Sequence, residues 1–351
     1  MSAAIGREAG TTGARIAGVV SCLPRAQVDN ERYAADFGQA AVEDVARMTG
    51  VRSRRHAAPG DTTRTLCHAA GLRLLEGLGW DPGSVDAVIF VSQTPDYRLP
   101  ASACALQADL GVGPACIAFD VNLGCSGYPY GLWLAMTMVQ GGAAGRVLLA
   151  VGDTISRLVD PRDRATALLF GDAGTVTAIE RDAAGGAAHF ILGSDGRGAA
   201  NLVVPQGAFR PHVAGLDARL DGRDPATLYM DGGEIFNFTL RAVPPLVART
   251  LELAGAGIEQ HDAFLFHQAN QFMLRHLVKK SRLPEAKVPM NIERYGNTSS
   301  ASIPLLMTTD LADALRERAQ RLALFGFGVG YSWASASLEV GPLRVCETIE
   351  R

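Results

Sequence analysis

What the chain lacks limits what it can be, beginning with membrane spans and strong charge. No run of its 351 residues approaches the roughly 20 apolar residues that a membrane-spanning helix needs. Lysine and arginine (33 residues) nearly balance aspartate and glutamate (36), so the net charge of −3 predicts no nucleic-acid partner. Residues 1–14 contain no apolar stretch typical of a signal peptide, and we therefore expect a cytoplasmic protein without a membrane partner.

Cysteine is also scarce, and its placement excludes further classes. The six cysteines are scattered and include no Cys-x-x-Cys pair, so reduced thiols are expected in a protein without an export signal. No zinc-ligand spacing, phosphate-binding P-loop or calcium-binding loop occurs, and no metal site is predicted. The composition, with 48% hydrophobic and 20% charged residues, is ordinary for an enzyme with a large core.

Two halves of the sequence look alike, at an offset of 176 residues. Residues 78–90 and 254–266 each pass from a helix through a glycine turn into an apolar strand that ends in phenylalanine. This regularity predicts an internal duplication. The segments that follow also correspond: helices at 101–110 and 271–282, strands at 116–121 and 287–292, helices at 125–140 and 298–315, and strands at 147–151 and 322–325.

The alternation of apolar, β-rich runs with longer helices predicts an α/β fold whose sheets are buried on both faces. Two such halves would pack around a shared layer of helices. The junction is expected near 181–188, where two glycines interrupt the pattern, so we predict one half over residues 1–184 and a second over 185–351. Residues 206–225 are rich in glycine, proline, arginine and aspartate and are expected to form a surface excursion beside a substrate tunnel.

The first chemically informative motif is Asn-Leu-Gly-Cys-Ser-Gly at 122–127. Cys125 lies between a strand that ends near Asn122 and a helix that starts at about Ser126, with glycines that allow a sharp turn. A thiol at a helix N-terminus is expected to have a lowered pKa, which favours the thiolate. Because a thiolate exchanges readily with thioesters to give an acyl-enzyme, we predict Cys125 as the nucleophile. The other five cysteines are interpreted as small buried hydrophobes.

Two further motifs supply an imidazole and an amide. His267 belongs to Phe-His-Gln-Ala-Asn at 266–270, directly after an apolar strand, and Asn297 belongs to Gly-Asn-Thr-Ser at 296–299, ahead of a helix. Alone, His267 would be interpreted as a histidine at the edge of the core and Asn297 as a helix cap or turn residue. With Cys125 they form a trio of functional groups at strand ends and helix starts, which a fold can bring to one point.

This trio fits decarboxylative Claisen condensation. Cys125 would carry the first acyl group, and His267 and Asn297 would hydrogen-bond the thioester carbonyl of a malonyl donor. Loss of CO2 leaves an enolate, and donors placed where negative charge develops are usually the largest catalytic effect. The acyl carbonyl on Cys125 needs its own oxyanion hole, which the N–H of Cys125 and an N–H from the glycine-rich run 325–330 could supply.

In order and spacing these motifs resemble the β-ketoacyl-ACP synthase III family of the thiolase superfamily, over most of the chain. Further matching strings are Thr-Gly-Val-Arg at 49–52, Asp-Pro-Arg-Asp-Arg-Ala-Thr at 160–166 and Leu-Phe-Gly-Asp-Ala-Gly at 169–174. The resemblance implies a thiolase-like five-layered αβαβα fold made of two duplicated halves. It also implies a homodimer with no metal or organic cofactor beyond the CoA or carrier-protein thioester. Its substrates would be an acyl-CoA or an acyl-ACP together with a malonyl thioester, and its partner an acyl carrier protein.

The same resemblance implies roles for individual residues. Cys125 is the nucleophile, His267 and Asn297 are the decarboxylation pair, and Gly330 completes the oxyanion hole with the N–H of Cys125.

Residues that bind substrate follow from the resemblance in the same way. Asn270 would lie along the pantetheine arm and Arg164 near the adenine end of CoA, while Leu99, Ile155 and Met230 would line the acyl pocket. Some positions depart from the family pattern and favour a specialised member, for example one in secondary metabolism. They are Asp44, Val45 and Ala46 in place of a tryptophan, Phe272 in place of an arginine, Gly233 in place of an asparagine, and Leu99 in place of an aromatic residue.

Other chemistries remain open on the sequence. Related enzymes with the same trio transfer the acyl group to an oxygen or nitrogen acceptor, with His267 as general base. A thiolase would need a second cysteine in the run 325–330, and an HMG-CoA synthase would need a glutamate base; neither is found. A serine hydrolase would need Gly-x-Ser-x-Gly, but residue 128 is tyrosine. A non-catalytic partner subunit would be expected to lose the nucleophile, which is present here.

Overall fold

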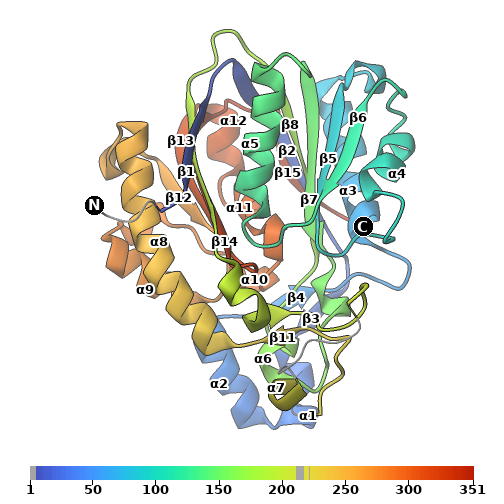
Figure 1. The fold of residues 1–351 in the computed structure, drawn as a ribbon, viewed down its shortest axis with the longest axis vertical. Helices are drawn as coiled ribbons and strands as arrows, with labels where there is room; N and C mark the ends of the chain where they lie inside the picture. The colour runs from blue at the N-terminus through green and yellow to red at the C-terminus, as the bar shows by residue number, and fades with distance from the viewer. Residues whose placement is uncertain (1–4, 211–216, 221) are drawn as a thin grey trace.

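Two β-sheets form the body of the protein, whose computed structural model describes residues 5–210, 217–220 and 222–351 (Figure 1). Across the first sheet of this described part the order is β15 (Val345–Glu350), β2 (Ala14–Leu23), β8 (Ala173–Arg181), β7 (Arg146–Asp153), β5 (Ala87–Val91) and β6 (Ile117–Val121). Across the second it is β1 (Arg7–Thr11), β9 (Ala188–Ser194), β14 (Ser332–Val340), β13 (Gln320–Gly328) and β12 (Ala263–Phe266). The strands β5 and β12 are apolar and buried throughout, and β7 is buried from Val147 to Asp153, as sheets covered on both faces require.

Helices cover both outer faces and fill the space between the sheets, which makes five layers. In the middle layer, α5 (Gly127–Gln140) and α11 (Ser302–Thr309) belong to an apolar cluster that joins both sheets through side chains such as Leu149 and Leu324. The predicted five-layered αβαβα fold is therefore confirmed. The outer layers are α3 (Thr63–Leu78) and α4 (Ser102–Asp109) on the first sheet, and α8 (Gly232–Ala254) and α9 (Gln271–Ser281) on the second (Figure 1).

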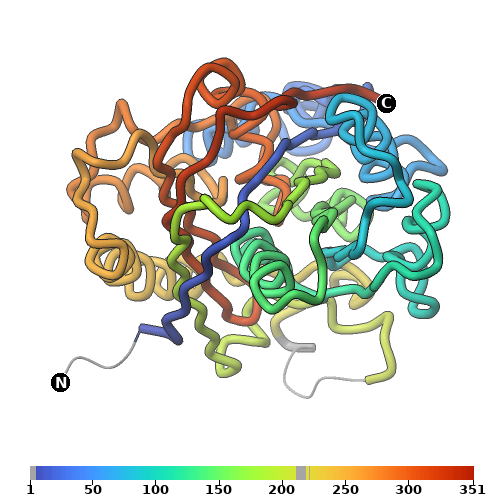
Figure 2. The backbone as a smooth tube through the Cα atoms, turned by 90° about the horizontal axis from the view of Figure 1, so that it is seen from above, coloured from blue at the N-terminus to red at the C-terminus, as the bar shows by residue number. Residues whose placement is uncertain are grey.

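The two ends of the chain cross between the halves. The N-terminal strand β1 pairs with β9 in the second sheet, whereas the C-terminal strand β15 pairs with β2 in the first. Figure 2 shows the blue N-terminal segment running across the centre of the molecule from one sheet to the other. The halves 1–184 and 185–351 remain a prediction for the body of each sheet, and the exchanged end strands depart from it.

One predicted element of the duplication is not formed. Residues 287–292 were expected to be the counterpart of β6, but the chain forms a short 3-10 helix at Glu285–Lys287 and the helix α10 (Ile292–Tyr295) there. Pro289 provides a physical reason, because proline has no N–H to donate to a ladder with β12. The second sheet therefore ends at β12, while β6 extends the first sheet by one strand.

Parallel strands bring several chain segments to one end of the body. β5 pairs in parallel with β6 and β7, and β12 pairs in parallel with β13, so their carboxyl ends lie together. Cys125 follows β6 and His267 follows β12. Smaller elements cover this end, at the bottom of Figure 1: β3 (Gln27–Asp29), β4 (Ser53–Arg55), β10 (Leu202–Val203), β11 (Tyr229–Met230), α1 (Ala34–Phe37), α2 (Gln39–Thr49), α6 (Arg164–Ala167) and α7 (Asp217–Leu220).

Candidate active site

The structure brings Cys125, His267 and Asn297 to one small cavity. All three line a space of about 70 Å³, together with Asn270 and Met230. Their exposed fractions are 8%, 2% and 5%, so the three groups are shielded from bulk water. A sulfur, an imidazole and an amide in one buried space are the arrangement that the sequence predicts.

Two glycines of β13 let the backbone pass directly over the nucleophile. A Cβ added at Gly328 would lie 2.9 Å from Cβ and 3.1 Å from Sγ of Cys125. A Cβ at Gly326 would lie 2.8 Å from both the carbonyl oxygen of Cys125 and Cα of Ser126. The glycine-rich run therefore serves close packing against the cysteine turn, since any side chain at these two positions would collide with it.

Burial, and not the helix N-terminus, governs the Cys125 thiol. Burial raises the pKa of Cys125 to about 12, although the Ser299 hydroxyl and the backbone N–H groups of Cys125 and Val329 oppose that shift. The sequence-based expectation of a lowered pKa is therefore wrong. The cause is that the strand β13 passes close over the cysteine turn and excludes water from it, although this turn looked open in the sequence. In the resting protein Cys125 is therefore a thiol, and its acylation would require a group that takes its proton.

The backbone donor that faces the sulfur is Val329. Its N–H and that of Cys125 both act on Sγ and oppose the rise of the thiol pKa, so both are available beside an acyl group carried on this sulfur. Gly330, the residue predicted for this role, is the next residue along and lines the larger cavity described below. The geometry favours Val329 over Gly330, a shift of one residue within the glycine-rich run.

His267 is held by a serine from the helix in the middle layer. Its Nδ1 lies 2.9 Å from Oγ of Ser302, and that hydroxyl also donates to the carbonyl oxygen of Ser299 at 2.9 Å. Burial lowers the pKa of His267 to about 3, so the ring is neutral at physiological pH. When the Ser302 hydroxyl donates to Ser299, Nδ1 carries the ring proton and Nε2 is an acceptor. When it turns to donate to Nδ1, Nε2 becomes a donor.

Asn297 is fixed on both sides by backbone. It forms a bridge with Phe170, in which its N–H donates to Leu169 at 2.9 Å and its carbonyl accepts from Gly171 at 3.0 Å. Its side-chain Oδ1 accepts the N–H of Ser299 at 2.9 Å, and Nδ2 donates to the Ala269 carbonyl at 3.4 Å. Because an amide nitrogen carries two N–H groups, one remains for a substrate oxygen.

A second, larger cavity begins at the same cysteine. It measures about 530 Å³ and is lined by Cys125, Ser299 and Val329 at one end. Its walls are mainly apolar and include Ile155, which was predicted to contact the acyl group. The predicted excursion 206–225 contributes Gln206, Gly207 and Ala208 to the lining of this cavity, and Ala226, which follows the excursion directly, lines it too. Residues 211–216 and 221 of the excursion lie outside the described part of the chain.

The remaining predicted binding residues are placed differently. Leu99 follows β5 in an exposed loop, is 78% exposed and is absent from the lining of both cavities, so its predicted place in the acyl pocket is wrong for a single chain. Arg164 is exposed at the start of α6. Asn270 caps α9 by accepting the N–H of Met273 at 2.7 Å, and it also lines the small cavity. Met230, at the end of β11, lines that small cavity too.

Sequence reasoning missed two polar residues next to the cysteine. Ser299 Oγ lies 3.9 Å from Cys125 Sγ, and Asp153 is a fully buried carboxyl group at the end of β7. The sequence does contain a signal that could have identified Asp153, because an ionisable residue at the end of a buried apolar strand needs hydrogen-bond partners. The sequence contains no such signal for Ser299, since serine is a common residue in a motif that starts a helix.

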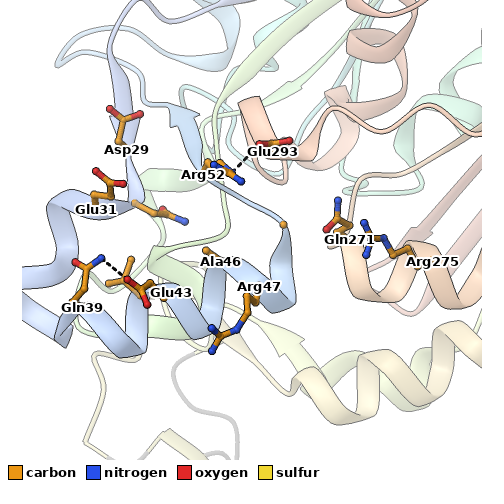
Figure 3. A pocket seen from close by; sticks show the side chains of 13 residues that line it. Asp29, Glu31, Gln39, Glu43, Ala46, Arg47, Arg52, Gln271, Arg275 and Glu293 are labelled. Carbon is orange, nitrogen blue, oxygen red and sulfur yellow. Dashed lines mark hydrogen bonds and ion pairs between the residues drawn. The ribbon is translucent and has the colours of Figure 1, made fainter.

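A hollow of about 800 Å³, larger than both cavities at Cys125, lies elsewhere (Figure 3). It lies between α2 and the start of α9, and none of the trio lines it. Figure 3 shows its charged rim, where Arg52 pairs with Glu293 at 2.8 Å and Gln39 bonds Glu43 at 2.8 Å. Size therefore does not identify the reactive site in this protein, whereas the chemistry of the lining does.

In residues 5–210, 217–220 and 222–351, no three histidine, cysteine, aspartate or glutamate side chains gather in a way that could hold a metal ion. In the same part of the chain, no helix combines the length and apolar character that crossing a bilayer demands.

Comparisons with known proteins agree with this geometry. The family profile of 3-oxoacyl-[acyl-carrier-protein (ACP)] synthase III matches residues 119–196, and the profile of its C-terminal part matches residues 251–340. The β-ketoacyl-[acyl-carrier-protein] synthase III of Rhodopirellula baltica is 34% identical over 346 residues, covering 92% of this chain and 97% of the relative.

Two further relatives are similar over nearly the whole chain. The β-ketoacyl-[acyl-carrier-protein] synthase III 2 of Streptomyces coelicolor is 36% identical over 343 residues, covering 96% of each protein. The crystal structure of a 3-oxoacyl-(acyl-carrier protein) synthase from Burkholderia xenovorans LB400 is 60% identical, with a TM-score of 0.98 and 99% of each chain covered. This chain therefore belongs to the β-ketoacyl-ACP synthase III family.

Proposed function

We propose that the protein joins an acyl group to a malonyl thioester by decarboxylative Claisen condensation. Its family membership makes it an acyltransferase of the 3-oxoacyl-[acyl-carrier-protein] synthase III type. The observation that carries the proposal is the meeting of Cys125, His267 and Asn297 in one buried cavity.

In the first half-reaction, an acyl thioester acylates Cys125. The sulfur attacks the thioester carbonyl, and the N–H groups of Cys125 and Val329 support the proposed oxyanion hole for the negative oxygen. The apolar cavity that includes Ile155 supports an acyl chain as the group that remains on the sulfur. CoA leaves as the second product.

In the second half-reaction, a malonyl thioester enters and loses CO2. Asn297 Nδ2 and His267 Nε2 would donate to its thioester carbonyl, whose oxygen gains negative charge as the carbon–carbon bond to CO2 breaks. The enolate carbon then attacks the acyl carbonyl on Cys125 and releases the β-ketoacyl product. Donors in a buried, low-dielectric site stabilise that charge more than water does, and a neutral His267 with Nε2–H can act throughout.

The thioester carriers follow from the same assignment. We propose CoA as carrier of the first acyl group and an acyl carrier protein, which the relatives' names include, as carrier of the malonyl group. Asn270 lines the small cavity beside His267, which supports its contact with a pantetheine arm. Arg164 is exposed at a helix start, which is compatible with contact to the adenine nucleotide end of CoA. No cofactor beyond these thioesters is proposed.

A homodimer is proposed from the free edge of β6. Ile117 on this strand is 42% exposed, and the loop that carries Leu99 is tied to the same strand. In that tie, the Asp120 carboxylate accepts the N–H groups of Ser102 and Ala103, each at 2.7 Å. An exposed apolar strand edge is normally covered, and a second copy of the chain would cover it by strand pairing. The six free cysteines support a reducing compartment such as the cytoplasm.

Intact-protein mass spectrometry tests the proposed function. The protein is incubated with a panel of acyl-CoAs and acyl carrier proteins, with Cys125→Ala as the control. One acyl adduct on the wild type, absent from Cys125→Ala, identifies the primer and its carrier. Added malonyl thioester should then discharge the adduct with release of CO2. Discharge onto an oxygen or nitrogen acceptor without CO2 would instead support simple acyl transfer, and no adduct with any donor would contradict the proposal.

A further inference from the structure

The short strand β4 lies between the two chain segments that hold the backbone of Asn297. It lies beside α10, the helix that leads into Asn297 (Figure 1). The Ser53 hydroxyl donates to the Arg294 carbonyl of that helix at 3.1 Å. On the other side, the Arg55 carbonyl accepts the N–H of Asp172 at 2.8 Å. One strand thus contacts both the approach to Asn297 and the chain that ends at Asp172.

Arg54, at the centre of β4, has a fully buried side chain. Its guanidinium donates to the Ala167 carbonyl at 2.9 Å and to Oδ1 of Asn30. Its Cζ lies 5.5 Å from the centroid of the Tyr33 ring. Two oxygens of neutral groups and an aromatic face therefore surround the buried charge. Because a buried cation that loses such partners is costly in free energy, the guanidinium resists any shift of these groups.

Asn30 extends this contact by one residue along the same segment. It is buried at the end of β3, and its Oδ1 accepts from Arg54. Its Nδ2 donates to the Leu168 carbonyl at 3.2 Å and to the Val51 carbonyl at 2.9 Å. Arg54 and Asn30 together hold two consecutive carbonyls, those of Ala167 and Leu168, where α6 ends. We call these two side chains the Arg54–Asn30 clamp.

The clamped carbonyls lead directly to the groups that hold Asn297. The Leu169 carbonyl accepts the Asn297 N–H at 2.9 Å, and the Gly171 N–H donates to the Asn297 carbonyl at 3.0 Å. The stem of Arg54 also packs against the residue before Asn297. A Cβ added at Gly296 would lie 2.9 Å from Cγ of Arg54, and a Cβ added at Gly171 would lie 3.4 Å from Cβ of Arg54. The arginine therefore supports Asn297 from both of the segments that meet there.

We propose that Arg54, together with Asn30, is a positioning residue that fixes the Asn297 amide for decarboxylation of the malonyl donor. Arg54 is absent from the lining of both cavities at Cys125, so it acts through Asn297 and not on the substrate. The clamp fixes the backbone of Asn297, and this backbone determines where Nδ2 meets the thioester carbonyl. The Cys125 sulfur and the Val329 N–H belong to other segments, so acylation does not depend on the clamp.

The inference rests on the proposed function for the step that it affects, but one of its tests needs no substrate. Hydrogen–deuterium exchange of the free protein reports on the peptides that cover 167–171 and 296–299. Arg54→Lys keeps the charge and the stem but lacks the planar fork that reaches two oxygens, so both peptides should exchange faster than in the wild type. A failure of every acyl donor to modify Cys125 would contradict the proposed function and leave this result intact.

Single-turnover kinetics separate positioning from a general loss of stability. Loss of CO2 from the malonyl donor should slow about tenfold in Arg54→Lys and about 10²-fold in Arg54→Met, which keeps only the stem. Acylation of Cys125 should keep its wild-type rate in both. Arg55→Met is the matched control, because Arg55 donates to the carbonyls of Pro24 and Arg25, at 3.0 and 3.2 Å, outside the clamped segment. It should lower the unfolding temperature and leave both half-reactions unchanged.

A double variant decides whether Arg54 acts through Asn297. Two changes that act on the same group give losses that do not add. Arg54→Lys should therefore slow decarboxylation by less than about threefold in an Asn297→Ala background, against about tenfold in the wild type. This comparison holds even where Arg54→Met does not fold. Equal losses in both backgrounds, wild-type decarboxylation in Arg54→Lys, or unchanged exchange at 167–171 would overturn the inference.

Discussion

The N–H of Ser299 donates a 2.9 Å hydrogen bond to Oδ1 of Asn297, which points the amide nitrogen of Asn297 toward the cavity. This contact decides which end of the amide meets the substrate. An oxygen facing the enolate would repel it, whereas the N–H groups can donate to it. Orientation of one amide by one backbone group is thus a condition for the second half-reaction.

Removal of the Asn297 amide should separate the two half-reactions. In Asn297→Ala, Cys125 should still be acylated, because its oxyanion donors are the N–H groups of Cys125 and Val329. Decarboxylation of the malonyl donor should fall by about 10²–10³-fold, the cost of one oxyanion donor. Single-turnover kinetics of each half-reaction provide the measurement. An equal loss in both would contradict the assignment.

The isosteric variant Asn297→Asp tests the role of the Asn297 amide more stringently than Asn297→Ala. The carboxylate keeps the size of the amide but places a negative oxygen where the enolate forms, so the second half-reaction should be slower than in Asn297→Ala. A variant with the reverse order of rates would show that Asn297 acts through packing alone.

Gly328→Ala should impair the nucleophile more than the fold as a whole. Its added Cβ would lie 3.1 Å from Cys125 Sγ, and its φ of 156° lies in the range that favours glycine. We expect the acylation rate to fall by about 10²-fold, the typical consequence of misplacing a reacting group by about 1 Å. Thermal unfolding and acylation kinetics are measured on one sample. Wild-type acylation would show that the sulfur does not need this close approach.

The neutral His267 predicts a pH dependence of stability. Burial holds its folded pKa at about 3, below the ordinary value of 6.5, so between these values the unfolded chain binds more protons than the folded one. Stability should therefore be fully present above pH 6.5 and should be lost as pH falls toward 3. His267→Gln removes this group, so its urea midpoint should fall less between pH 7 and pH 5 than that of the wild type. Parallel decreases would mean that His267 is not the buried, depressed group described here.

Ile155 offers a test of the acyl cavity. It lines the 530 Å³ cavity at the nucleophile, so Ile155→Phe should reduce the space for a long acyl chain and leave room for a short one. The ratio of acylation rates for long and short acyl-CoAs should drop by about tenfold, equivalent to about 1.4 kcal/mol of lost binding. The short donor is the internal control. An unchanged ratio would place the acyl chain elsewhere.

The fold and the trio are predictable from the sequence because their signals are local. A strand, a glycine turn and a helix start surround Cys125, a buried strand precedes His267, and Asn297 follows a glycine ahead of a helix start. The repeated order of these units indicates the duplicated sheets. The predictions that are wrong concern features that depend on contacts between segments distant in the sequence. Pro289 removes a strand that the repeat predicts, and the end strands β1 and β15 change sheets.

The fine geometry of the site depends on tertiary packing in the same way. The Cys125 pKa rises because β13 closes over a turn that is more than 150 residues away from that strand in sequence. Val329, and not Gly330, faces the sulfur because of how that strand docks, which a run of alternating glycines does not specify. Leu99 lies outside the cavity for a similar reason, since its loop is anchored to β6 through Ser102 and Asp120.

The most direct test of the central claim is a single turnover of the acyl-enzyme with malonyl thioester labelled in its free carboxyl group. The wild-type enzyme, acylated on Cys125, should release one labelled CO2 for each β-ketoacyl product formed. Asn297→Ala should hold its acyl group and release almost none. Loss of the acyl group from the wild type without labelled CO2 would contradict condensation and would assign the trio to acyl transfer.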